Sequence, residues 1–356
     1  MKLVYILVAI LFFGFFIAAH EFGHFITAKS CGVRVEEYSI GMGPLLWQKQ
    51  GKETAYSLRL LPLGGYCAIE GEDGEADSPR SLSAQGYWKQ VLVFAAGALM
   101  NFLIGLILLL VIYASAQSFL TPTVVALHDG FPDEGEQGIM VGDTIYALNG
   151  ERIYLASDVE LVMQLGKFDE ERTLHATLLR DGEKIERTLR LHDYTDDEGN
   201  TVRAYGFSYG GVEKATPLLR LRYAWYNAID FVRMVRMSLR MLLTGEAGVR
   251  DLSGPVGIVS AMEQVGTQSE SRRIAFENIA YYAALVTVNL AVMNLLPIPA
   301  LDGGKILFLT VNTVGMKLFG KRISARAEQV LGGICFSLLI ALMLFVTFSD
   351  ITKLLA

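Results

Sequence analysis

The run HEFGH at residues 20–24 combines residue types and spacing that suit metal chemistry. On a helix, positions i and i+4 share one face, so His20 and His24 can bind the same divalent ion through their imidazoles. Glu21 follows His20 directly and can act on a water molecule at that ion. The pattern predicts a zinc-dependent hydrolytic site, because zinc accepts imidazole and carboxylate ligands.

A third zinc ligand has to come from elsewhere, since catalytic zinc takes three protein ligands and keeps one open position. Asp302 is the first candidate, because it ends a long apolar run on the same side as the histidine pair. Glu36 and Glu37 are the second candidates, although no helix aims them. A helix-capping role for Asp302 is the alternative. The remaining histidines lie in a separate polar stretch: His128, His175 and His192.

Apolar stretches long enough to cross a bilayer, which takes about 20 residues of helix, position these residues. They are residues 3–26, 91–113, 279–301 and 330–348. With 52% apolar residues, the composition agrees with a polytopic α-helical membrane protein of four transmembrane helices. Ionisable groups at a span are costly unless they are paired or coordinated, so a metal site is favoured over histidines that merely end the first span.

The orientation follows from the basic residues of the short loops, which concentrate on the cytoplasmic side. They gather in loop 28–90 and after residue 301: Lys29, Arg34, Lys49, Lys52, Arg59, Arg80, Lys89, Lys305, Lys317, Lys321, Arg322 and Arg326. Both termini and residues 114–278 are therefore expected outside the cytoplasm, with the active site near the cytoplasmic side.

Residues 32–71 alternate apolar and polar side chains between glycine and proline turns, which predicts a membrane-associated β-hairpin sheet. An ordinary loop is the alternative. Between residues 121 and 209, short β-like runs are separated by the turn pairs Asn149-Gly150 and Asp181-Gly182. This second region predicts an inserted soluble β-rich domain.

Residues 217–244 interleave arginines with apolar side chains, which is typical of a helix lying on a membrane surface with snorkelling arginines. The arginines are Arg220, Arg222, Arg233, Arg236 and Arg240. A fifth span is the alternative, but this arginine density disfavours it.

Other functional classes are excluded by composition. The net charge of -6 argues against a nucleic-acid partner, because phosphates require a basic face. The three cysteines have no CxxC spacing, so neither a disulfide framework nor a cysteine zinc site is expected.

Two resemblances add to this interpretation. Residues 138–153, GIMVGDTIYALNGERI, resemble the signature of PDZ domains, which bind an extended peptide or chain end. HEFGH, NLLPIPALDGG at 294–304 and LSGPVGI at 252–258 resemble the site-2 protease family, specifically its PDZ-containing bacterial intramembrane metalloproteases. The family resemblance extends over nearly the whole chain.

The resemblance implies that His20, His24 and Asp302 hold Zn²⁺ and that Glu21 is the catalytic base. It also implies that Asn289 and Asn294 engage the unwound substrate backbone. The expected substrates are single-span membrane proteins, such as anti-sigma factors or signal-peptide remnants, trimmed beforehand by another protease. The expected location is the bacterial cytoplasmic membrane.

Four parts of the chain are expected. They are residues 1–120 with spans 1 and 2 and the hairpin, 121–212 as the PDZ domain, 213–277 as a juxtamembrane amphipathic region, and 278–356 with spans 3 and 4. Two other functions stay open. One is a catalytically silent zinc-binding scaffold, which has no need of Glu21; the other is a metal transporter, which a soluble peptide-binding domain disfavours.

An intramembrane protease must unwind its substrate, because helical hydrogen bonds hide the amides and hydrocarbon holds no water. Pro297 and Pro299 interrupt the third span and predict non-helical backbone that lines a polar cavity and contacts substrate. The predicted hairpin offers an edge on which an extended substrate can pair as an added strand.

Overall fold

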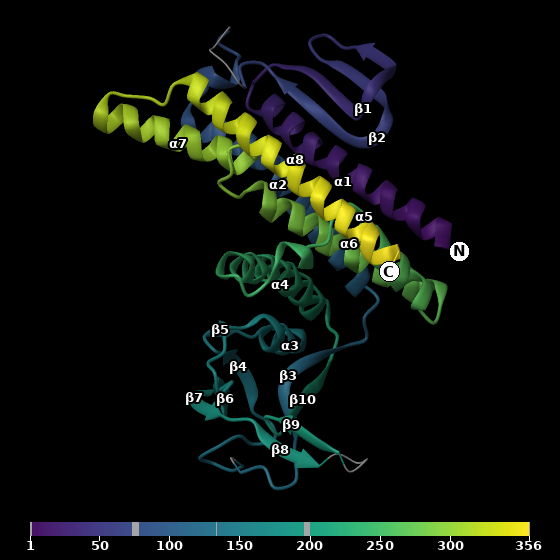
Figure 1. Cartoon of the computed structure of the whole chain (residues 1–356), viewed down its shortest axis with the longest axis vertical. Helices are drawn as coiled ribbons and strands as arrows, with labels where there is room; N and C mark the ends of the chain where they lie inside the picture. Colours follow the sequence, from purple (N-terminus) through teal and green to yellow (C-terminus); the bar gives the residue numbers. More distant parts are fainter. Residues whose placement is uncertain (1, 73–77, 133, 196–199, 356) are drawn as a thin grey trace. The chain divides into compact units, whose positions relative to one another are not determined.

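A computed structural model describes residues 2–72, 78–132, 134–195 and 200–355 (Figure 1). The chain forms two compact units. Unit 1 consists of Met1–Leu109 and Gly248–Ala356, and unit 2 consists of Leu110–Ala247. The predicted histidine site and the hairpin belong to unit 1, and the predicted soluble domain belongs to unit 2.

Unit 1 is built on long apolar helices, as the hydropathy of the sequence predicts. Within the described residues, 4 helices are long and apolar enough to cross a membrane. They are α1 (Lys2–Ser30), α2 (Tyr87–Tyr113), α6 (Arg272–Asn294) and α8 (Ala325–Leu355). The sequence prediction of four apolar spans is confirmed.

The third predicted span is wrong at its end, because α6 stops at Asn294 rather than at residue 301. Pro297 and Pro299 follow within five residues, and proline removes a backbone donor and clashes with the preceding turn. The chain then forms turns before the helix α7 (Asp302–Phe319), which the sequence analysis did not predict. Asp302 is thus the first residue of a new helix.

The start of α7 lies against the backbone that leaves α6. A Cβ atom on Gly303 would stand 2.3 Å from the Leu295 carbonyl oxygen, and one on Gly304 would stand 2.1 Å from the Ile298 oxygen. Only glycine allows backbones to approach this closely. The close packing at Gly303 and Gly304 therefore fixes the position of Asp302 at the start of α7.

The helix α5 (Pro255–Gln268) contacts α1, α6 and α8. Its N-cap residue, Gly254, has no side chain to satisfy the free N–H groups of the first turn. Asp350 of α8 supplies the missing acceptor, because its Oδ2 accepts hydrogen bonds from the Gly254 and Gly257 amides at 2.9 and 2.8 Å. Asp350 is only 3% exposed.

The predicted hairpin is confirmed as β1 (Val35–Gln50) and β2 (Ala55–Ile69), an antiparallel pair. The strand β2 bends back, so that Tyr38 of β1 pairs with Tyr56 on one side and with Cys67 on the other. In the described part of the chain, no further strand joins this sheet. The segment 65–69 therefore keeps an open outer edge. A one-turn helix (Leu82–Ala84) follows before α2.

Unit 2 contains one main antiparallel sheet. Its strand order is β10-β3-β4-β6-β7, and β5 also pairs with β4. The strands are β3 (Ser118–Leu127), β4 (Thr144–Leu148), β5 (Glu151–Arg152), β6 (Leu174–Arg180), β7 (Glu183–Leu189) and β10 (Phe207–Lys214). A separate hairpin comprises β8 (His192–Thr195) and β9 (Thr201–Ala204). The helix α3 (Ala156–Leu165) packs with the sheet through the buried Val159 and Val162.

The two turn pairs predicted in this region are confirmed. Asn149 and Asp181 have φ angles of 47° and 49°, and each is followed by a glycine with positive φ. Two successive residues with positive φ define the turn that matches the twist of a β-hairpin, and Asn-Gly and Asp-Gly tolerate it best. These turns join β4 to β5 and β6 to β7.

The helix α4 (Pro217–Thr244) has the bounds expected for the arginine-rich segment. Four of its arginines bind partners inside unit 2, which was not expected from the sequence. Arg220 and Arg240 donate to the carbonyl oxygens of Ala116 and Leu165, and Arg236 pairs with Glu151. Arg233 is buried between the side-chain oxygens of Asp158 and Asp230, at 3.5 and 3.3 Å. A single turn (Val249–Asp251) precedes α5.

Candidate metal centre

The helix α1 carries His20 and His24 on one face, as the i and i+4 spacing predicts. Both residues are largely buried, with exposed fractions of 9% for His20 and 8% for His24. Their Nε2 atoms lie 3.2 Å apart, and the imidazole ring planes are nearly perpendicular. Both side chains therefore point toward one shared position.

Asp302 joins this pair from the first turn of α7. Its Oδ2 lies 3.2 Å from the Nε2 of His20 and 3.4 Å from the Nε2 of His24. Within the described residues, this is the only group of three His, Cys, Asp or Glu side chains placed to hold a metal ion. The structure thus brings together the histidine pair and the first-ranked third candidate.

The three atoms suit a zinc ion in spacing and in chemistry. Tetrahedral zinc with bonds of about 2.0–2.1 Å keeps its ligand atoms about 3.3 Å apart. The Nδ1 of His24 donates a hydrogen bond to the Val93 carbonyl at 2.8 Å, which leaves its Nε2 lone pair free. Asp302 Oδ2 is buried without a hydrogen-bond partner in the described structure. A cation is the group that such acceptors require.

The helix α2 forms the wall behind the histidines. A Cβ atom on Gly97 would stand 2.4 Å from His24 Nε2 and 2.6 Å from His20 Nε2. Asn101, one turn further along α2, places its Nδ2 3.5 Å from His20 Nδ1. Neither residue was expected at the site from the sequence, although an asparagine inside a strongly apolar span is a signal of a polar role.

Glu21 lies beside the hairpin. The strand β2 passes so close that a Cβ atom on Gly65 would contact the Cγ of Glu21 at 3.5 Å. Tyr38 of β1 donates a hydrogen bond to the Ala18 carbonyl of α1 at 3.0 Å. Burial, with a smaller contribution from the Glu21 carboxylate, raises the pKa of Tyr38 to about 12, so its hydroxyl remains a donor. The hairpin is thereby fixed next to the histidine pair.

Glu36 and Glu37, the second-ranked ligand candidates, do not face the histidine pair. Glu37 accepts hydrogen bonds from Ser57 at 2.6 Å and from Arg59 at 3.2 Å. Burial opposes ionisation of Glu37, but hydrogen bonds from Ser57, Tyr66 and Arg59 outweigh it and lower its pKa. Glu36 is solvent-exposed on β1. Neither carboxylate belongs to the metal-ligand group.

The residues expected to contact substrate lie at and after the end of α6. Asn294 places its Nδ2 3.5 Å from His20 Nδ1, so it borders the histidine pair. Asn289 and Pro297 are exposed, and Pro299 is half-buried. Pro297 and Pro299 belong to the non-helical connection between α6 and α7, as predicted from the sequence.

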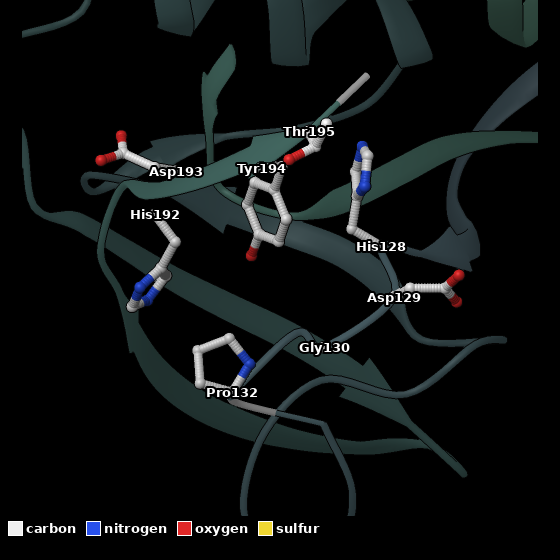
Figure 2. A pocket seen from close by; sticks show the side chains of 8 residues that line it. All are labelled: His128, Asp129, Gly130, Pro132, His192, Asp193, Tyr194 and Thr195. Atoms are coloured by element: carbon white, nitrogen blue, oxygen red, sulfur yellow. The ribbon is translucent and has the colours of Figure 1, made fainter. Parts of the chain in front are cut away.

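The histidines of unit 2 do not converge in this way. His128 and His192 line a cavity of about 640 Å³ together with Tyr194. Figure 2 shows the two imidazoles on opposite sides of the Tyr194 ring, whose centroid lies 4.6 Å from that of His128 and 6.5 Å from that of His192. His175 lies on β6 and contacts Thr188. These histidines form no metal-ligand group in the described residues.

The sequence was also compared with known proteins. The model of Peptidase family M50 matches residues 8–342. The chain belongs to this family, the site-2 proteases. A Clostridium perfringens protein named "Putative zinc metalloprotease" is 33% identical over 98% of both chains. A protein of the same name from Clostridium acetobutylicum is 32% identical over 97% of both chains. The "Regulator of sigma-W protease RasP" of Bacillus subtilis is 26% identical over 97% of both chains.

Family membership and these relatives identify the M50 protein as a zinc metalloprotease, and Zn²⁺ as its metal. Its apolar helices, together with the family, identify it as a membrane protein. Both conclusions agree with the sequence analysis.

Proposed function

We propose that this M50 protease cleaves single-span membrane proteins within the bilayer, with His20, His24 and Asp302 as its zinc ligands and Glu21 as the base. The observation that carries the proposal is the convergence of three buried acceptor atoms at 3.2–3.4 Å without a hydrogen-bond donor for Asp302 Oδ2. A capping role alone gives Asp302 no reason to face two imidazoles.

The chemistry divides between the metal and the protein. When bound, zinc lowers the pKa of water to about 7 and polarises a carbonyl group. Glu21 stands next to the ligand histidine in sequence and takes the proton from the attacking water. It then returns the proton to the amine that leaves. Glu21 needs no hydrogen-bonded partner of its own for this role, only a position at the metal face of α1.

Substrate binding in this proposal uses the open edge of the hairpin. The segment 65–69 of β2 passes beside Glu21, and an extended substrate segment can add to this edge as a strand. Asn289 and Asn294 hydrogen-bond to the unwound backbone, and the connection with Pro297 and Pro299 lines the cavity. Backbone hydrogen bonds offered by a strand replace those that the substrate helix loses.

We further propose that residues 121–212 form a PDZ domain that binds a peptide or chain end. A cavity of about 440 Å³ lies between α3 and β10, lined by Val159, Met163, Phe207, Tyr209, Arg172 and Arg203 among others. In the described residues, β10 pairs only with β3, so its other edge is available for a peptide strand. The apolar lining suits an apolar terminal side chain, and the arginines suit a carboxylate.

This role is tested by binding. Fluorescence anisotropy of a labelled peptide with an apolar C-terminal residue should give saturable binding to the purified full chain. Met163→Glu should weaken it at least about tenfold, because a charge enters the apolar cavity. The amidated peptide is the control for carboxylate recognition. Absence of binding would leave the domain as a filter that excludes large substrates.

The basic loops support the orientation of this proposal, with the active site near the cytoplasmic face of a bacterial membrane and unit 2 outside. Substrates already trimmed by another protease are part of the proposal. Anti-sigma factors and signal-peptide remnants are the proposed substrate classes. The name of the Bacillus relative, a regulator of sigma-W, supports the first.

The deciding experiment compares wild type with Glu21→Gln on a purified single-span substrate. Glu21→Gln should lower the cleavage rate by about 10²–10⁴-fold, the usual contribution of a general base, while zinc content stays unchanged. Equal cleavage by both proteins would remove Glu21 as the base. A zinc-binding wild type that cleaves no substrate would favour the scaffold, and zinc flux into vesicles would favour a transporter.

A further inference from the structure

The helix α2 presents three residues to the histidine pair at successive turns of one face. They are Val93, whose carbonyl accepts from His24; Gly97, which leaves room for both rings; and Asn101, which borders His20. Their spacing of four residues keeps them on one stripe of the helix. The stripe supplies no metal ligand, but each residue touches an imidazole.

The two histidines differ in how their second ring nitrogen is satisfied. A histidine that binds a metal through Nε2 carries its proton on Nδ1 and donates it to a carbonyl, carboxylate or other acceptor. His24 has such an acceptor in Val93. His20 has no carbonyl within hydrogen-bonding distance in the described structure, and its Nδ1 neighbours are the amides of Asn101 and Asn294, both at 3.5 Å.

Asn101 is the better placed of these two amides. It is 1% exposed, and its Oδ1 is buried without a hydrogen-bond partner in the described residues. Its backbone is held as well, because the buried Thr287 of α6 donates to the Asn101 carbonyl at 3.2 Å. Asn294, by contrast, is half-exposed at the last residue of α6.

We propose that Asn101 is the positioning residue for His20, with its Oδ1 accepting the Nδ1–H and thereby fixing the tautomer that leaves Nε2 for zinc. A half-turn of the amide about its Cβ–Cγ bond exchanges Nδ2 and Oδ1. In this rotated amide, the Nδ1–H of His20 donates to Oδ1 of Asn101, so the proton has an acceptor and Oδ1 has a donor. The inference rests on the proposed zinc site of His20, His24 and Asp302.

An amide suits this position better than a carboxylate. The site lies in an apolar span, where each added charge is costly. Asp302 and Glu21 already place two carboxylates beside one divalent ion. A neutral acceptor orients His20 without adding a third negative charge. The proposal also separates the two asparagines, because it leaves Asn294 free for the substrate.

The experiment measures zinc affinity by chelator competition on the purified full chain in detergent. Asn101→Leu should weaken zinc binding by about 10–100-fold, the usual loss when the partner of a ligand histidine is removed. Asn101→Asp should restore binding to within about threefold of wild type, because its carboxylate accepts the same proton. Asn294→Leu, the matched control, should bind zinc like wild type.

A second readout excludes a merely structural effect. At saturating Co²⁺, the visible absorption of Asn101→Leu should differ from that of wild type, whereas Thr287→Val, which loosens the same helix contact, should leave it unchanged. Wild-type zinc affinity and spectrum in Asn101→Leu would overturn the proposal, as would a greater loss in Asn294→Leu. If His20→Ala still binds zinc like wild type, the proposed zinc site itself is wrong. If His20→Ala loses zinc but Asn101→Leu keeps wild-type zinc affinity, only the role of Asn101 is wrong.

Discussion

Both units bury aspartates, but the partners of these aspartates differ. In unit 2, Asp143 is 2% exposed, and Arg180 binds both of its carboxylate oxygens at 2.7 Å. In unit 1, Asp302 faces two imidazole nitrogens, and its Oδ2 has no hydrogen-bond partner in the described residues. The first carboxylate is neutralised by the chain itself, while the second is, in the proposed function, the ligand of a zinc ion.

The difference separates stability from activity. A buried ion pair that loses one member leaves an unpaired charge and destabilises the fold. When a cluster of metal-binding acceptor atoms loses one member, it binds its metal ion less tightly. In the metal-free protein, the remaining acceptor atoms then repel one another less. Substitutions at the two aspartates should therefore have opposite consequences, and the following variants test this contrast.

The largest effect is expected for Asp302→Ala. Loss of one of three ligands should weaken zinc binding by more than about 100-fold, beyond the loss from an outer partner, and reduce cleavage to background. The melting temperature measured in excess chelator should equal or exceed that of wild type. Metal analysis after gel filtration and a thermal melt test both points. Unchanged zinc content would reopen Glu36 and Glu37 as ligands.

Asp143→Asn should do the reverse. It leaves the Arg180 guanidinium without its anion, so the free energy of unfolding of unit 2 should fall by about 3 kcal/mol, while zinc content stays at the wild-type value. Denaturant titration of the full chain, followed by fluorescence, measures the loss. The double variant Asp143→Asn/Arg180→Met should recover part of it. Additive losses would show that the pair contributes nothing.

Gly97→Ala should combine a packing defect with a metal defect. The added methyl group meets the Nε2 atoms of both histidines. In the control Gly105→Ala, also on α2, the methyl group instead meets the Val288 side chain of α6 at 2.5 Å. Both variants should lose about 1–3 kcal/mol of stability through overpacking. Only Gly97→Ala should also weaken zinc binding in a chelator titration. Equal zinc affinities would mean that the histidines can move aside.

The smallest effect is expected for Asp230→Asn in unit 2. Burial, followed by the neighbouring Asp158 carboxylate, raises the pKa of Asp230. The folded state then holds a proton that the unfolded state releases above pH 3.8, so wild-type stability falls as the pH rises toward the folded pKa. Asp230→Asn should remove this slope and be the more stable protein at pH 8.

Melting temperatures of Asp230→Asn and wild type at pH 6 and pH 8 measure this difference. Asp158→Asn is the matched control, because Asp158 pairs with Arg233 and also accepts the Tyr154 and Leu155 amides. It should be destabilising at both pH values. A steeper pH slope in Asp230→Asn than in wild type would contradict the proton on Asp230.

Much of this arrangement can be predicted from the sequence where a pattern is local. The apolar runs, the turn pairs at Asn149 and Asp181, and the i, i+4 spacing of His20 and His24 each encode their own geometry. Asp302 could be ranked above Glu36 and Glu37 because span counting places it at the same end of the spans as His20 and His24. These predictions need only periodicity, turn chemistry and topology.

The remaining features depend on contacts between distant segments. The span through residue 301 was predicted too long, because leucine and isoleucine continue around Pro297 and Pro299 and hide the end of α6. The arginines of α4 suggested a lipid surface, but apart from Asp230 of α4 itself, the carboxylates and carbonyls that bind them come from elsewhere in unit 2. The contacts of Gly97 and Asn101 with the histidines depend on α2 packing against α1, which the local sequence does not predict.

The contact of Asp350 with the start of α5 has a consequence for biogenesis. Synthesis of the Gly257 amide precedes that of its acceptor by 93 residues. Until α8 has entered the bilayer, the first turn of α5 must keep its N–H groups hydrated or unsatisfied, and α5 is a neighbour of α1. The amide groups at the start of α5 therefore gain their carboxylate acceptor only after the last helix of the chain has been made.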